Sequence, residues 1–151
     1  MDWTFDVALK NRKIMSSFID AFSFEDLNKI PEKFNNNLIW NIAHLIVTQQ
    51  LLTYSLSGLP MQISDALVDK YKKGSMVDGN VSQEEINEIK GLLISTIEKT
   101  KEDYEKGVFN SFQPYTTSTN STLKSFEEAM EFNNFHEGIH LGYILALKKS
   151  L

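Results

Sequence analysis

The chain has 151 residues, of which 42% are hydrophobic and 23% are charged, and its formal net charge is −5. This length suits one globular domain over residues 1–151, and the acidic balance argues against nucleic acid as a partner because phosphate binding needs a basic surface. The lack of cysteine excludes disulfides, thiolate metal sites and a cysteine nucleophile, and no apolar run reaches membrane-spanning length, so we expect a cytoplasmic protein.

Apolar residues repeat at three- and four-residue steps in four stretches, which predicts four amphipathic helices. The first covers residues 3–22, with Arg12 off its apolar stripe, and a short capped turn ends near Pro31. The second follows the asparagines at residues 35–37 and continues to Ser57, where a Gly-Leu-Pro sequence stops it.

The connection over residues 60–81 is longer than neighbouring antiparallel helices need, and it has room for a short helix over residues 64–73. A connection of this length predicts a crossover along the body of a helix bundle. The third helix is expected over residues 82–106, where a capping box opens it and a glycine follows its end.

Residues 108–122 are rich in Ser, Thr and Asn, which predicts a loop with at most a short extended piece. Another capping box at Ser125 opens the fourth helix, which is expected to run to Lys149. The chain therefore predicts an all-α fold, a four-helix bundle with a long crossover between helices two and three.

Histidine occurs three times in the chain, and these positions define the candidate site. His136 and His140 are four residues apart in the fourth helix, so they lie on one face, and His44 lies on a partly apolar face of the second helix. Three imidazoles on one metal ion leave coordination positions open, as in catalytic zinc sites. The same pattern also fits a helical interaction module in which the histidines are packing residues.

Polar and aromatic residues on the same helix faces are candidates for pocket walls or for hydrogen bonds to the imidazoles. These residues are Trp40, Asn41, Thr48, Asn133 and Tyr143. Glu137, between the two histidines of the fourth helix, is the candidate catalytic base for hydrolysis. It equally fits a solvent-facing residue or a partner of a ligand imidazole.

Two segments of the chain resemble the motifs of the DinB-like superfamily of four-helix-bundle proteins. They are Trp40-Asn-Ile-Ala-His44-Leu in the second helix and His136-Glu-Gly-Ile-His140-Leu-Gly in the fourth. The resemblance covers nearly the whole chain, including helix order and the long connection. It departs at Tyr143, where the family usually has Gln, so the family's substrate choice does not transfer to this chain.

The resemblance implies a divalent metal ion, typically zinc or nickel, held by His44, His136 and His140, and it implies a homodimer. Relatives include bacillithiol- and mycothiol-dependent enzymes. We therefore expect a metal-dependent enzyme acting on a small-molecule substrate, foremost an S-transferase in which the metal activates a low-molecular-weight thiol. The alternatives are a metal-dependent hydrolase using metal-bound hydroxide and a non-catalytic, metal-bearing stress or binding protein.

Overall fold

A computed structural model describes residues 1–151, and most of the chain is helical. The long helices are α1 (Asp2–Ala21), α3 (Leu38–Gln50), α5 (Gln83–Glu105) and α6 (Phe126–Leu147). The remaining elements are α2 (Phe24–Asn28), the π-helix η1 (Leu51–Ser55), α4 (Asp65–Tyr71), β1 (Tyr115–Thr116), β2 (Thr122–Leu123) and the 3-10 helix η2 (Lys148–Ser150). The all-α prediction is confirmed.

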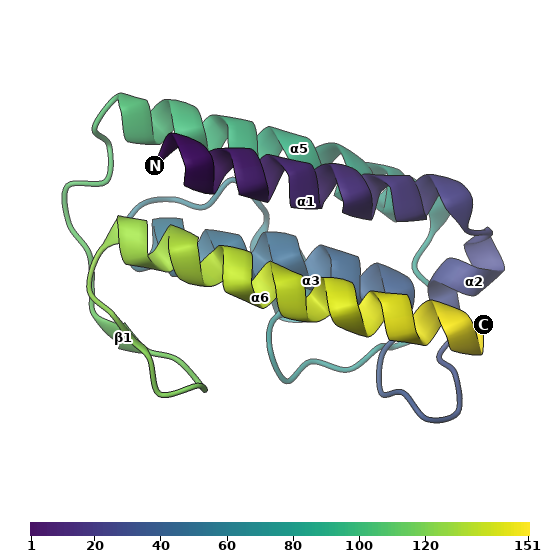
Figure 1. Ribbon diagram of the computed structural model, residues 1–151. Helices are drawn as coiled ribbons and strands as arrows, with labels where there is room; N and C mark the ends of the chain where they lie inside the picture. The colour runs from purple at the N-terminus through teal and green to yellow at the C-terminus, as the bar shows by residue number, and fades with distance from the viewer.

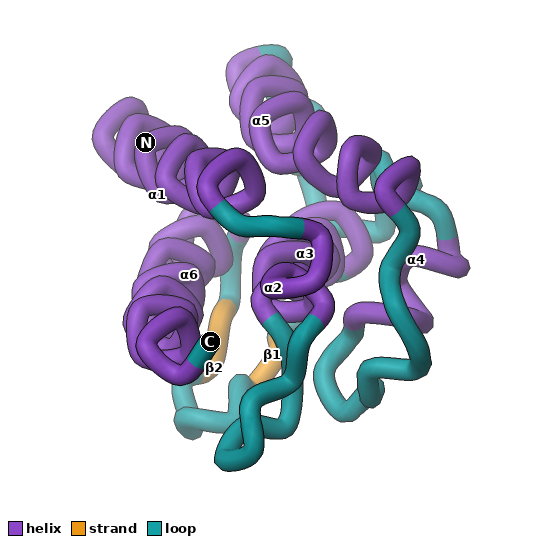
Figure 2. Tube along the Cα trace, turned by 90° about the vertical axis from the view of Figure 1, so that its right-hand side faces the viewer, coloured by secondary structure: helices purple, strands orange, loops and turns teal.

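The four long helices lie side by side (Figure 1), and each contacts two of the others. Helices α1 and α5 form one pair and α3 and α6 the other, and α4 flanks α3 on the side away from α6 (Figure 2). Contacts between α1 and α6 and between α3 and α5 join the two pairs. None of these helices combines the length and the apolarity that crossing a membrane requires.

Helix α3 is the central element of the fold, because α2, α4, α5 and α6 all contact it. The side chain of Asn37 begins the helix by accepting a hydrogen bond from the Trp40 backbone N–H at 2.9 Å. Every residue of the helix except Thr48 is buried. Such all-round burial explains why the segment is apolar on most of its faces rather than on one stripe.

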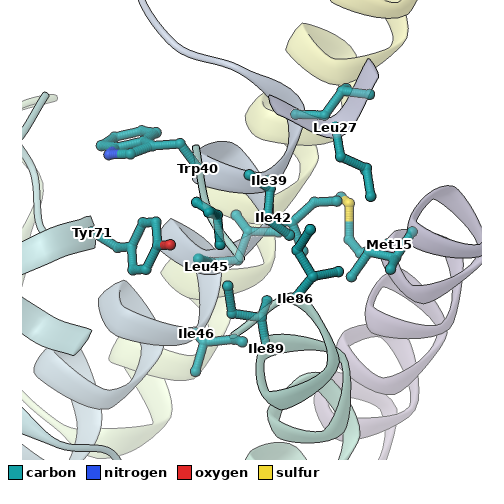
Figure 3. Packing of buried hydrophobic residues seen from close by; sticks show 14 of the residues in the cluster. Met15, Leu27, Ile39, Trp40, Ile42, Leu45, Ile46, Tyr71, Ile86 and Ile89 are labelled. Atoms are coloured by element: carbon teal, nitrogen blue, oxygen red, sulfur yellow. The ribbon is translucent and has the colours of Figure 1, made fainter. Parts of the chain in front are cut away.

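The main hydrophobic core forms where α3 meets its neighbours (Figure 3). Ile42 and Ile46 of α3 pack with Ile86 and Ile89 of α5, and Met15 of α1 belongs to the same cluster. All five side chains are fully buried. This packing holds α3 in a fixed position, which matters because α3 carries one of the three histidines.

The helix predicted up to about Ser57 is present as α3 followed directly by η1, and over Leu51–Ser55 it is a π-helix rather than an α-helix. The Leu56 N–H donates to the Leu51 carbonyl, five residues earlier, at 3.3 Å. The hydroxyl of Thr53 donates to the Gln49 carbonyl at 2.7 Å, at the start of this wider turn. Such π segments commonly occur at functional sites.

The segment over residues 108–122, predicted as a loop with at most a short extended piece, contains most of a small hairpin. Tyr115 pairs with Leu123 and Thr116 pairs with Thr122 in an antiparallel arrangement. The short helix expected within residues 64–73 is present as α4, which Ser64 caps by accepting from the Leu67 N–H. Both connections bring residues toward α3 and α6, where the histidines lie.

Candidate metal centre

The three histidines meet between α3 and α6. One ring nitrogen of each histidine lies within 4.8 Å of the corresponding nitrogens of the other two. The centroid of the His44 ring is 5.2 Å from that of His136 and 4.9 Å from that of His140. The centroids of the His136 and His140 rings are 4.6 Å apart. The structure thus brings together all three candidate ligands that the sequence predicts.

The His44 ring is fixed by residues of α3 and α4. Its Nδ1 lies 2.6 Å from the backbone carbonyl of Tyr71, which accepts but cannot donate, so Nδ1 carries the proton and Nε2 keeps its lone pair. The hydroxyl of Thr48 lies 3.2 Å from Nε2. The indole of Trp40 stacks on the imidazole, with centroids 4.7 Å apart and an interplanar angle of 11°. The connection that contains α4 therefore orients one of the three rings.

The His140 ring is fixed by an asparagine of α3. Asn41 Nδ2 donates to the Asn37 carbonyl at 2.8 Å, so its Oδ1 is the atom that faces His140. His140 Nδ1 lies 2.9 Å from this oxygen and donates to it, which leaves Nε2 as the lone-pair nitrogen. An oxygen acceptor on the far nitrogen is the usual support of a metal-binding imidazole.

His136 differs from the other two histidines, because its buried Nδ1 has no hydrogen-bond partner in the protein. Its ring lies one helical turn before His140, so its position is set by α6 rather than by a dedicated acceptor. The protein thus fixes the tautomer of two rings and leaves that of the third open.

All three imidazoles are held in the neutral form. Burial lowers the pKa of His136 to about 3 and that of His140 to about 4, and repulsion from neighbouring rings adds to both effects. Burial also lowers the pKa of His44, against the hydrogen bond to Tyr71, which raises it. Neutral rings offer the lone pairs that a cation needs, so this donor set fits a divalent ion of the kind that imidazole binds well.

A comparison with known protein families identifies the chain. The family model described as the DinB superfamily matches residues 9–144, which include both histidine-bearing helices. The chain belongs to the DinB superfamily. This result confirms the resemblance carried by the two histidine motifs, in a superfamily whose members commonly bind metal. No curated protein matches the sequence significantly.

Glu137 has a different environment from the one expected of a catalytic base in this DinB protein. It is fully buried and its Oε1 accepts from Arg12 Nε and from Asn133 Nδ2, each at 2.8 Å. Arg12 also donates to the Leu45 carbonyl at 3.1 Å, so the group joins α1, α3 and α6. The interpretations of Glu137 as solvent-facing and of Arg12 as lying off the apolar face are wrong. The sequence holds one signal of this buried pair: Arg12 is the single arginine beside fourteen lysines, and arginine is preferred in buried ion pairs.

A cavity of about 350 Å³ opens beside the histidine cluster. His44 and His136 line it, together with residues of η1, the hairpin and α6. The other lining residues are Thr48, Leu51, Leu52, Ser55, Leu56, Lys73, Tyr115, Thr117, Ser118, Thr119, Phe132, Phe135 and Ile139. The volume is within the range of small-molecule sites.

Of the other residues predicted at the pocket, only Thr48 lines this cavity. Trp40 and Asn41 instead contact the imidazoles from outside it, and Asn133 bonds to Glu137. Tyr143 packs edge-on against Phe34, with centroids 5.3 Å apart. Sequence reasoning missed Phe132, Phe135, Ile139 and the hairpin residues, because the cavity depends on how the hairpin lies against α6.

Proposed function

We propose that this DinB protein is a metal-dependent S-transferase that joins a low-molecular-weight thiol to an electrophilic small molecule. His44, His136 and His140 would hold the divalent ion, zinc or nickel. The observation that carries the proposal is the convergence of three neutral imidazoles, two of which, His44 and His136, line a cavity. A bound ion of this kind acts as a Lewis acid that lowers the pKa of a coordinated thiol or water.

The surrounding residues support a site that is organised before substrate binds. The Tyr71 carbonyl and the Asn41 side chain hold two rings with their lone pairs available, and the stacked Trp40 limits rotation of His44. We propose that the four long helices form a four-helix bundle, and that the connection through α4 is its long crossover. In this arrangement the crossover supplies the acceptor for His44.

The lining of the cavity favours transfer over hydrolysis. A hydrolase commonly places a carboxylate near the attacking water, and no carboxylate lines this cavity. Glu137, the carboxylate nearest in sequence, accepts from Arg12 and Asn133 instead. A thiol cosubstrate needs no such base once its pKa has been lowered, and the chain has no cysteine to serve in its place.

We further propose a homodimer formed through α6. Phe135, Ile139 and Tyr143 are exposed at four-residue intervals along this helix, at 54%, 51% and 36%. Between Phe132 and Leu147 the only acidic or basic side chain apart from the histidines is Glu137, which is buried. A twofold interface places a surface against its own copy, so an uncharged stripe avoids like-charge repulsion in a protein of net charge −5.

Metal analysis of protein purified without a histidine tag tests the site. We expect near-stoichiometric metal in the wild type and in the control Tyr143→Phe, and a sharp loss in His44→Ala and His136→Ala. A wild type that neither carries metal nor binds added zinc or nickel would overturn the proposal. The same result follows if both histidine variants keep the wild-type metal content.

Turnover assays separate the kinds of function. The metal-loaded protein is mixed with a panel of thiols and with an electrophile such as monochlorobimane, before and after chelation. Thioether formation that is lost with the metal supports the transferase. Metal-dependent ester hydrolysis without any thiol shows a hydrolase, and inertness across thiols, electrophiles and esters shows a non-catalytic protein. Either of these two outcomes overturns the transferase.

A further inference from the structure

The cavity beside the histidines contains one cationic side chain and no anionic one. Lys73 is exposed and lines the cavity without forming an ion pair. The two neighbouring lysines differ, because Lys70 pairs with Glu85 and Lys72 pairs with Asp69, each at 2.6 Å. The ammonium of Lys73 is therefore the one positive charge at the cavity that no carboxylate of the protein neutralises.

The rest of the cavity is divided between apolar walls and hydroxyl groups. Leu51, Leu52 and Leu56 belong to η1 and the residue after it, and α6 contributes Phe132, Phe135 and Ile139. Hydroxyl groups come from the hairpin tip, at Thr117, Ser118 and Thr119. An apolar molecule with one anionic group matches this lining better than a polar, multiply charged molecule does.

We propose that the cavity binds an apolar carboxylate, whose anionic group pairs with Lys73 and whose apolar body lies against Leu52, Phe132 and Phe135. This step rests on the proposed function: the molecule is the electrophilic acceptor rather than the thiol, because low-molecular-weight thiols are mostly polar. Its reactive end then lies toward His44 and His136, which line the same cavity. Lys73 is accordingly a specificity-determining residue and takes no part in bond making.

The electrostatics of the chain support this assignment. The protein has 20 acidic and 15 basic residues apart from histidine, so its surface as a whole disfavours anions. The cavity lacks carboxylates and carries an unpaired ammonium, which makes it a local exception. No other lysine, arginine or carboxylate lines the cavity, so among its charged side chains Lys73 alone distinguishes an anionic ligand from a neutral one of the same shape.

The test compares decanoate with decanol, which share an apolar chain and differ in charge. Binding is measured by displacement of the neutral fluorophore N-phenyl-1-naphthylamine from the metal-loaded protein. We expect Lys73→Met to weaken decanoate binding about fivefold, the size of one solvent-accessible ion pair, and to leave decanol binding unchanged. Lys73→Arg should keep the preference, Lys73→Glu should weaken decanoate further, and high salt should reduce the difference.

Two controls locate the effect. Lys72→Met removes a neighbouring positive charge that is already paired with Asp69, and it should behave as the wild type. Ser55→Trp fills the cavity from an exposed position and should weaken both ligands, with an unchanged circular dichroism spectrum. Equal weakening by Lys72→Met and Lys73→Met, or no effect of Ser55→Trp, overturns the proposal.

Repeating the titrations after chelation separates this inference from the proposed function. A preference for decanoate that depends on Lys73 with and without metal supports the carboxylate site. A preference that disappears with the metal and ignores Lys73 places the carboxylate on the ion and overturns it. If the protein binds no metal but keeps the Lys73-dependent preference, the transferase fails and the anion-binding cavity stands.

Discussion

The buried pair between Arg12 and Glu137 gives the most direct test of how this fold supports its site. We expect Glu137→Gln to destabilise the folded state, because the guanidinium of Arg12 then stays buried without a counter-charge. Both side chains are 0% exposed and their closest atoms are 2.8 Å apart. Glutamine keeps an oxygen that accepts from Arg12 and Asn133, so the substitution removes the charge with little change in shape.

The expected loss in free energy of unfolding follows from the burial of the pair. Removing one partner of a fully buried ion pair costs about 3–5 kcal/mol, and the retained hydrogen bonds favour the lower end, about 3 kcal/mol. Domains unfold with about 5–15 kcal/mol, so the variant remains folded, with a Tm lowered by roughly 6–12 °C. Arg12→Met should cost a similar amount, because it strands the carboxylate. The double variant removes both charges and should lose less than the sum of the single losses.

Urea unfolding followed by far-ultraviolet circular dichroism measures these differences on chelated protein at neutral pH. In a separate metal analysis without chelator, the folded Glu137→Gln variant should bind as much metal as the wild type, because the Glu137 side chain faces Arg12 and Asn133. A loss below about 1 kcal/mol, or single losses that simply add in the double variant, contradicts the reasoning about the buried pair. Full stability with loss of turnover alone would return Glu137 to the role of catalytic base.

Three further outcomes are expected. Asn41→Leu removes the acceptor of His140 Nδ1 and should weaken metal binding about 10- to 100-fold in chelator competition, while unchanged affinity would contradict that support. In chelated protein, stability should fall as pH drops from 6.5 toward 3, because His136 and His140 have folded pKa values of about 3 and about 4, so the unfolded chain takes up protons first. The loss at about pH 5 is roughly 2 kcal/mol for each of these residues, and urea titrations that are flat from neutral pH to about pH 5 would exclude it. Ile139→Lys should convert the proposed dimer to a monomer in size-exclusion chromatography with light scattering, and a monomeric wild type would refute the α6 interface.

The parts of this protein that sequence predicts well depend on local spacing. Capping residues such as Ser82 and Ser125 begin α5 and α6 as expected, since a cap acts within three residues of itself. The pair His136 and His140 shares a face because one helical turn separates them. Their meeting with His44 needed the family resemblance, because spacing within one helix says nothing about which helix lies opposite.

The parts that sequence did not predict depend on contacts between distant segments. Arg12 and Glu137 are 125 residues apart, and neither position alone shows that its charge is buried against the other. The acceptor for His44 comes from Tyr71, in a connection with little periodic pattern. Likewise, the π-type pairing of Leu56 with Leu51 is a backbone feature that hydrophobic periodicity does not detect.

The π segment η1 follows directly on α3, and the two helical segments have separate tasks. His44 and its α3 neighbours Trp40 and Thr48 precede the segment, whereas Ser55 and Leu56 of the cavity wall lie at its end or beyond it. Deleting one residue from Leu51–Ser55 would restore regular helical pairing and turn the residues directly after it by about 100°. The histidine would stay in place while the cavity wall changed. A change of chain length by a single residue is thus a route to a new ligand range at an unchanged metal centre, open to evolution and to protein engineering alike.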